Sequence, residues 1–151
     1  MGTITIRQAV AGDAVLVHRL LKDLAGTLGK ADVMTSTPAD IERFGFGEQP
    51  RFEALLAFEG EEPVGLALYF FEFSTWRGRP GVYVQDMYVA PQTRGRGLGR
   101  DLMEAVMRRS RERGGSYVKL AVYDGNEQAI GFYRSLGFEV CEDEQVLALR
   151  D

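Results

Sequence analysis

The sequence feature that most constrains the fold is an arginine- and glycine-rich segment, residues 94–100, between an expected strand and an expected helix. Glycines at positions 95, 97 and 99 lack a Cβ atom, so backbone amides can approach a ligand closely. A helix that begins here adds unpaired N–H groups and the positive end of its dipole, which together bind phosphate. The segment predicts a strand–loop–helix unit with a phosphate site. The simpler alternative is a glycine-rich turn without a ligand.

The charge around this segment allows two interpretations. Residues 94–113 contain seven arginines and three acids, whereas the whole chain has a formal net charge of −4. An acidic chain is not typical of a general nucleic-acid-binding protein, so we expect no nucleic-acid partner. The local positive charge indicates either a solvated basic helix face or the field of a site for a phosphorylated ligand.

Two better-known phosphate motifs do not fit the sequence. A dinucleotide fingerprint read from either of the first two glycines needs a third glycine, where the chain has Arg100 or Leu102. A P-loop needs serine or threonine after glycine–lysine, and Gly29-Lys30 is followed by Ala31. The segment is therefore a different kind of phosphate loop, if it binds phosphate.

Length and composition predict a single domain over residues 1–151. No apolar run approaches the roughly 18 residues of a membrane-spanning helix, and residues 1–10 are typical of an amphipathic strand rather than a secretory signal. One cysteine, Cys141, and one histidine, His18, exclude a disulfide framework and a multi-cysteine or histidine-rich metal site. We expect a cytoplasmic protein without a metal and without a membrane partner.

Hydrophobic periodicity and turn residues predict the order β-α-α-β-β-β-α-β-α-β. The predicted helices are capped by Asp13, by Thr37 before Pro38, by the glycine-rich segment and by Asn126. The second helix is expected to end before Gly45. Strands are predicted at residues 3–7, 54–58, 64–73, 82–89, 117–123 and 146–149. This order predicts an α/β (α+β) domain with one central mixed sheet.

Two groups of residues give the chain a family resemblance. Arg94, Gly97 and Gly99, after a strand that ends in Tyr88-Val89, resemble the acetyl-CoA pyrophosphate loop of the GNAT superfamily of N-acetyltransferases. The second half of the chain is similar to that superfamily's C-terminal signature, which is carried here by Asn126, Glu127, Ala129, Phe132, Tyr133, Gly137 and Phe138. The resemblance implies the GNAT fold, in which helices flank a mixed, mostly antiparallel sheet.

Three further segments resemble one branch of that superfamily, the diamine (spermidine/spermine and thialysine) acetyltransferases. They are residues 44–48, residues 67–71 with the turn at Trp76, and residues 83–89. The resemblance covers nearly the whole chain. It implies acetyl-CoA as cosubstrate, a small-molecule amine as acceptor and a homodimer.

The resemblance also implies residues that bind acetyl-CoA. The backbone of Met87, Tyr88 and Val89 would pair with the pantetheine arm like an added strand, although a buried strand with nothing bound is the simpler alternative. Asn126, with Ala129 of the same signature, would contact the CoA arm, and Asn126 is also typical of a helix cap. The pyrophosphate would be held by the loop residues Arg94, Gly95, Arg96, Gly97, Leu98, Gly99 and Arg100.

The resemblance gives Tyr133 the role of general acid. Attack of an amine on a thioester expels a thiolate, which a phenol can protonate. The alternative is a core tyrosine, because Ala129, Ile130, Tyr133 and Leu136 form one helical stripe.

The chain departs from the diamine branch where an acceptor would bind. That branch has a glutamate before the aspartate of the fourth strand, where this chain has Gln85 before Asp86. It also has a tyrosine–glutamate pair after the first helix, which aligns with Thr27 and Leu28. Asp86 keeps one acid at the expected site, or is a structural acid at a strand end. Fewer acids predict an amine smaller than spermine.

The expected function is therefore transfer of an acetyl group from acetyl-CoA to a primary amine of a diamine, polyamine or lysine-like amino acid, by direct attack. One alternative is acetylation of a protein lysine or N-terminus. Another is a non-catalytic CoA-binding sensor or structural subunit. Retention of Tyr133 beside an intact glycine loop disfavours the sensor, because a sensor needs no acid.

Overall fold

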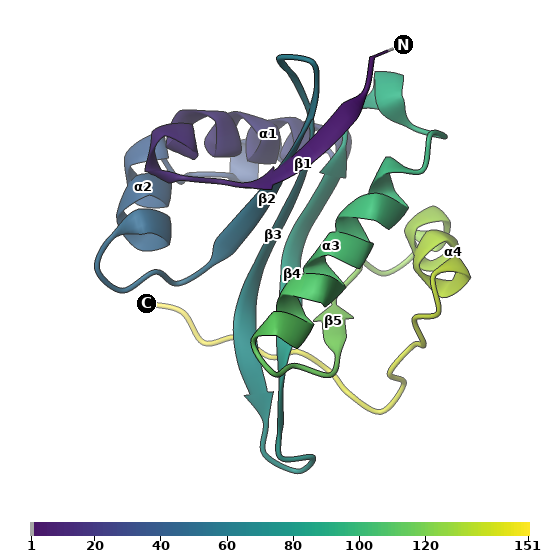
Figure 1. The fold of residues 1–151 in the computed structure, drawn as a ribbon. Coiled ribbons are helices and arrows are strands. Elements are labelled where there is room, and N and C mark those ends of the chain that lie inside the picture. The colour runs from purple at the N-terminus through teal and green to yellow at the C-terminus, as the bar shows by residue number, and fades with distance from the viewer. Residues whose placement is uncertain (1) are drawn as a thin grey trace. The chain divides into compact units, whose positions relative to one another are not determined.

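The computed structural model describes residues 2–151, and the chain divides into two compact units, Met1–Ala121 and Val122–Asp151. The first unit contains a five-stranded sheet in the order β1-β2-β3-β4-β5. Neighbouring strands are antiparallel except β4 and β5, which are parallel (Figure 1). The strands are β1 (Ile4–Gln8), β2 (Glu53–Glu59), β3 (Glu62–Ser74), β4 (Arg79–Val89) and β5 (Val118–Leu120). The predicted mixed, mostly antiparallel sheet is confirmed.

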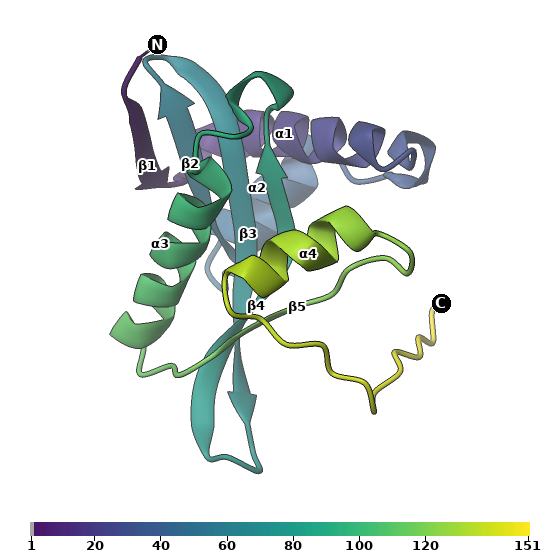
Figure 2. The ribbon, with the colours of Figure 1, turned by 90° about the vertical axis from the view of Figure 1, so that its right-hand side faces the viewer.

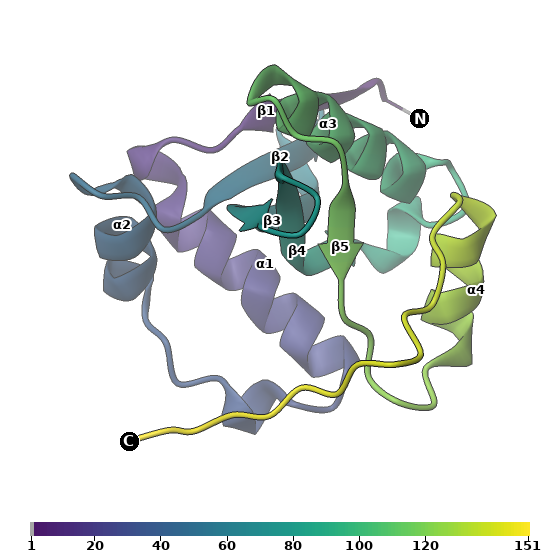
Figure 3. The same cartoon turned by 90° about the horizontal axis from the view of Figure 1, so that it is seen from below.

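Three helices of the first unit cover the two faces of this sheet. They are α1 (Ala14–Thr27), α2 (Pro38–Phe46) and α3 (Leu98–Glu112). Figure 3 shows α1 and α2 on one side of the sheet and α3 on the other. Three 3₁₀ turns, Ala11–Asp13, Ala31–Val33 and Pro91–Thr93, lie between these elements. Apolar burial between the layers stabilises the unit, and its fully buried side chains include Val17, Leu20, Leu56, Leu66, Leu98, Leu102 and Val106.

The helix starts show which capping predictions hold. The Thr37 hydroxyl accepts a hydrogen bond from the Asp40 amide, and the Asp40 carboxylate accepts one from the Thr37 amide, which confirms the predicted start of α2. The predicted cap of α1 by Asp13 is wrong, because the Asp13 carboxylate accepts from the Arg7 guanidinium and from the Val10 amide instead. Asp13 directly precedes α1, but its carboxylate oxygens accept hydrogen bonds from residues earlier in the chain and not from the amides of the helix.

The second helix is longer than predicted, because Gly45 lies inside it. A Cβ atom at Gly45 would lie 2.4 Å from Cζ of Phe52, so the missing side chain makes room for this ring. The glycine therefore serves close packing rather than helix termination.

The second unit contains α4 (Glu127–Ser135), followed by chain without regular structure. The predicted cap is confirmed, since Oδ1 of Asn126 accepts from the Ala129 amide at 3.2 Å.

The strand predicted at residues 146–149 is wrong, because no strand follows α4 in the described part of the chain, and Val146, Leu147 and Leu149 are exposed. Alternating apolar residues favour a strand, but a strand also needs a hydrogen-bonded neighbour. The strand predicted over residues 117–123 forms, but it covers only Val118–Leu120.

The β3–β4 hairpin extends past the end of β2 (Figure 2). Pairing between β2 and β3 ends at Glu53 and Tyr69, so residues 70–74 pair only with β4. Trp76, in the turn of the hairpin, is fully exposed. Its side chain therefore does not pack against the rest of its unit.

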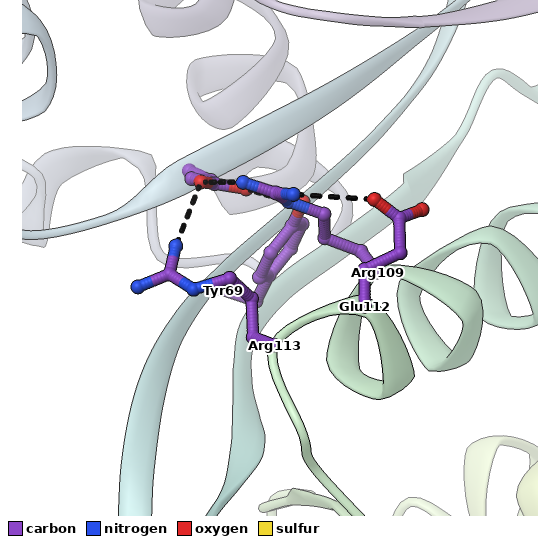
Figure 4. A network of polar contacts seen from close by, with 5 residues as sticks. Tyr69, Arg109, Glu112 and Arg113 are labelled. Atoms are coloured by element: carbon purple, nitrogen blue, oxygen red, sulfur yellow. Dashed lines mark hydrogen bonds and ion pairs between the residues drawn. The ribbon is translucent and has the colours of Figure 1, made fainter.

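Helix α3 is fixed to the sheet by a network of charged groups around Glu53 (Figure 4). The Arg109 guanidinium donates two hydrogen bonds of 2.8 Å to the Glu53 carboxylate, and the Tyr69 hydroxyl donates a third of 3.0 Å. Burial raises the pKa of Glu53, but the hydrogen bonds from Arg109 and Tyr69 outweigh it and hold the pKa below its usual value. Glu53 is thus a charged anchor between β2 and α3.

Replacing Arg109 with methionine keeps an unbranched apolar stem and removes the guanidinium. We expect Arg109→Met to lower the free energy of unfolding at neutral pH by about 1–3 kcal/mol, because a largely buried carboxylate loses two hydrogen bonds and keeps Tyr69 and, at 3.9 Å, Arg113. Since the folded-state pKa of Glu53 is depressed, the loss should disappear as the pH falls through that pKa and both proteins protonate the carboxyl group. Urea unfolding across this pH range measures the effect. Arg108→Met, at an exposed position on α3, is the control, and an equal loss there contradicts the role of Arg109.

Candidate active site

A β-bulge in β4 determines where its polar side chains lie. Val84 is opposite Tyr69 of β3, whereas Asp86 is opposite Leu68, so Gln85 is the extra residue between two paired ones. Adjacent residues of β3 face opposite sides of the sheet, so Val84 and Asp86 also lie on opposite faces. Val84 lies on the face that α3 covers, and the bulge turns Asp86 away from it.

Asp86 is a half-buried acid, and the described residues offer its carboxylate no hydrogen bond or ion pair. Burial raises the pKa of Asp86 to about 6. At neutral pH the group is therefore mostly ionised, and it is basic enough to accept a proton. The alternative of a structural acid at a strand end would require a partner within the protein.

An aromatic pair lies on the same face of the sheet as Asp86. Phe70 and Tyr83 are cross-strand partners, with ring centroids 5.3 Å apart and ring planes inclined by 14°. Both rings are half-buried. A stacked aromatic surface next to a carboxylate can contact the alkyl chain and the charge of an ammonium compound. Sequence reasoning missed this pair, because its register depends on the bulge.

Strand β4 has a free edge at the residues expected to bind the pantetheine arm. Its parallel pairing with β5 covers Val82–Val84 and ends there. Met87, Tyr88 and Val89 pair with β3 on one side, and β5 does not reach them on the other. Backbone N–H and C=O groups of this edge can therefore pair with an extended ligand.

The glycine-rich loop leads from β4 through the turn Pro91–Thr93 into α3, as predicted. Gly95 and Gly97 have φ angles of +80° and +82°, a left-handed conformation that favours glycine, and Gly97 immediately precedes the helix. The first amides of α3 have no intrahelical acceptor. The loop and helix therefore offer several N–H donors and a positive dipole end to an anion.

The arginines of the loop have different partners. Nε of Arg94 donates to the carbonyl oxygen of Val89 at 3.2 Å, and Arg96 pairs with Glu59 at 2.8 Å. Arg100 is exposed on the first turn of α3. The sequence had no signal for Glu59, which is 37 residues before its partner.

The remaining predicted acceptor residues, Thr27 and Leu28, lie at the C-terminal end of α1. The Thr27 hydroxyl donates to the carbonyl oxygen of Leu24 at 2.7 Å, and Leu28 follows the last residue of the helix. The described residues show no hydrogen bond between this helix end and Gln85 or Asp86. The structure therefore gives Thr27 and Leu28 no direct contact of this kind with the acid of β4.

Tyr133, Asn126 and Ala129 belong to the second unit. The Tyr133 ring lies between those of Phe132 and Phe138, at centroid distances of 5.1 and 5.5 Å. Burial raises the pKa of Tyr133 to about 12, so its phenol stays protonated at neutral pH. This is the protonation state that a general acid needs.

Residues 2–151 show neither a metal-binding cluster nor a membrane-spanning helix. The described side chains contain no group of three or more histidine, cysteine, aspartate or glutamate residues that could hold a metal ion. None of the described helices has the length and apolar character to cross a membrane.

Comparison with known proteins gives a match over most of the chain. Residues 18–138 match the sequence profile described as the acetyltransferase (GNAT) family. A thialysine N-epsilon-acetyltransferase of Bos taurus is 34% identical over 145 residues, which cover 91% of this chain and 85% of that protein. A human spermidine/spermine N(1)-acetyltransferase-like protein 1 is 32% identical over 91% of this chain, which corresponds to 21% of its own length.

The fold agrees with solved structures. A possible acetyltransferase from Clostridium difficile 630 superposes with a TM-score of 0.81, at 22% sequence identity, with 98% of each chain covered. At this level of identity the likeness concerns the fold.

The unpartnered carboxyl group of Asp86 should cost the protein stability. Its folded-state pKa lies above that of an unfolded aspartate, so stability falls as the pH rises from about 4 to 6 and the buried group ionises. Asp86→Asn does not titrate, and we expect it to raise the free energy of unfolding by about 1–3 kcal/mol at pH 7. This gain should be absent near pH 4. Chemical unfolding at both pH values measures it, with Asp32→Asn, at an exposed position, as control. A destabilised Asp86→Asn protein would show that the carboxylate has a structural partner.

Proposed function

Because the chain belongs to the acetyltransferase (GNAT) family, we propose that it transfers the acetyl group of acetyl-CoA to a primary amine of a lysine-like amino acid or a short diamine. The observation that carries this proposal is the glycine loop at the start of α3, directly after a strand edge that β5 leaves free. The family is one of acyltransferases, so the chain is an enzyme of this class. We propose that the two compact units form one N-acetyltransferase domain that acts as a cytoplasmic homodimer.

The residues around the loop suit the parts of acetyl-CoA. The free edge at Met87–Val89 can hold the amide-containing pantetheine arm by backbone hydrogen bonds. The amides of residues 94–100 can hold the pyrophosphate, as the family resemblance implies. We assign Asn126 and Ala129 of α4 to the CoA arm on that resemblance alone.

The reaction needs one proton acceptor and one proton donor. The amine nitrogen attacks the thioester carbonyl carbon, a C–N bond forms, and the C–S bond breaks. We assign the first proton that leaves the ammonium ion to Asp86, through ordered water, and protonation of the departing thiolate to the Tyr133 hydroxyl. The second proton, which the nitrogen loses as the amide forms, restores the Tyr133 phenol, and Asp86 releases its proton to solvent. The products are an N-acetylated amine and free CoA.

The acceptor class follows from the charge that the site offers. Asp86 supplies one carboxylate, and the rings of Phe70 and Tyr83 lie on the same face of the sheet. Gln85 and Leu28 carry no charge where the diamine branch has glutamates, and Thr27 stands where that branch has a tyrosine. One carboxylate can pair with one ammonium group, so a compound with several ammonium groups gains little. The thialysine acetyltransferase relative agrees with an acceptor that resembles lysine.

The acceptor is tested by release of CoA thiol with thialysine, lysine, spermidine, spermine and a lysine peptide. We expect the best kcat/KM with the lysine-like compounds and poor use of spermine. Gln85→Glu should improve use of spermidine and spermine about tenfold or more, because a charge-assisted hydrogen bond is worth about 1.5–3 kcal/mol. Gln49→Glu adds the same charge at an exposed site and should change nothing. Efficient spermine acetylation that is insensitive to residue 85 contradicts this acceptor assignment, and transfer only to the peptide favours a protein acetyltransferase.

The role of Tyr133 is tested by removing one oxygen atom. Tyr133→Phe keeps the ring that packs against Phe132 and Phe138, so stability should be retained. We expect kcat to fall about 10²–10⁴-fold, the usual range for a lost general acid, with little change in KM for acetyl-CoA. Tyr123→Phe, at an exposed tyrosine of the same unit, is the matched control. A Tyr133→Phe enzyme of full speed would mean that the residue is only part of the core.

A further inference from the structure

The glycine loop is tied to the rest of its unit by an ion pair that the proposed chemistry does not use. Nη2 of Arg96 lies 2.8 Å from Oε2 of Glu59, and it also donates to the carbonyl oxygen of Gly2 at 3.3 Å. The Gly2 amide donates to the same Glu59 oxygen at 2.9 Å. Figure 1 shows the start of β1, the β2–β3 turn and the chain before α3 at the same end of the sheet.

The backbone of the loop has few restraints of its own. Arg96 stands between two glycines whose φ angles are +80° and +82° and whose missing Cβ atoms would touch nothing within 4 Å. Among residues 2–151, the amides of Gly95, Arg96 and Gly97 donate to no protein acceptor. The side chain of Arg96 is therefore the contact that fixes the middle of the loop.

We propose that Glu59 is a positioning residue for acetyl-CoA: through Arg96 it holds the loop so that the free amides converge on the pyrophosphate. This inference rests on the proposed function. In it, Arg96 is an anchor and not a direct ligand of the phosphates. A loop that is ordered before binding loses less conformational entropy when the ligand arrives, which increases affinity.

The electrostatics of the pair agree with an anchor. Both side chains are 23% exposed, so solvent screens the pair only in part. The hydrogen bond from Arg96 holds the pKa of Glu59 below its usual value, and the pair stays charged at neutral pH. Because Glu59 neutralises Arg96, the attraction for an anion comes from the amides, the helix dipole and the other arginines of the loop.

The test measures binding of CoA by isothermal titration calorimetry to the full chain. We expect Glu59→Gln and Arg96→Gln each to raise Kd about tenfold, the scale of one lost charge-assisted hydrogen bond. The double variant should bind no worse than either single variant, because each change breaks the same contact. Glu61→Gln is the matched control, since it removes an acid from the same turn at an exposed position without a described partner.

A shortened cosubstrate separates positioning from a general loss of structure. S-acetylpantetheine lacks the pyrophosphate, so its KM should be the same for the parent protein and Glu59→Gln. With acetyl-CoA, KM should rise while kcat at saturation stays unchanged. Glu59→Asp, which keeps the charge on a shorter side chain, should restore part of the affinity and serves as second variant if Glu59→Gln is unstable.

Each contrary result has a distinct meaning. Unchanged CoA affinity in Glu59→Gln overturns the inference. Weaker binding in Arg96→Gln with unchanged or tighter binding in Glu59→Gln also overturns it, because Arg96 would then bind the phosphates directly. Equal loss with acetyl-CoA and S-acetylpantetheine would show a purely structural pair. If the parent protein binds no CoA at all, the proposed function fails, independently of Glu59.

Discussion

The extra residue in β4 is the constraint on which the chemistry of the first unit depends. Without the bulge at Gln85, strand alternation would put Asp86 on the same face as Val84, beneath α3. An unpaired carboxylate there would cost several kcal/mol, by the general cost of burying charge. The bulge puts the acid on the opposite face, with Phe70 and Tyr83. One strand thus carries apolar packing, an acid and a free edge within a few residues.

Sequence reasoning succeeded where a signal was local and failed where it depended on a partner. The capping residues Thr37 and Asn126 act within a few residues of themselves, so their patterns were sufficient. The bulge was not predicted: Asp86 breaks the apolar alternation that Val82 and Val84 begin, but only the register with β3 shows that Gln85 is the extra residue. Asp13 failed as a cap because Arg7 and the Val10 amide compete for its oxygens.

The arginine-rich region, residues 94–113, shows how structure divides a charge that the sequence could only count. The alternatives were a solvated helix face and a phosphate field, and the structure shows which arginines are paired with acids and which are exposed. Arg96 and Arg109 are paired with Glu59 and Glu53 of β2. Arg100 and Arg108 remain exposed. Since acids of the sheet neutralise part of the positive charge, we expect the proposed anion site to depend more on the backbone amides of the loop than the composition suggested.

Asp86 and Tyr133 illustrate how burial alone can prepare two groups for opposite tasks. Burial disfavours the charged form of both, and it raises the pKa of Asp86 to about 6 and that of Tyr133 to about 12. At neutral pH the carboxylate is therefore mostly ionised and can accept a proton, whereas the phenol is protonated and can donate one. An unpaired acid that costs stability is typical of a functional site, and the ammonium group of the proposed acceptor would supply the missing partner. The energetic cost of Asp86 is therefore an argument for the acceptor site, independent of any resemblance.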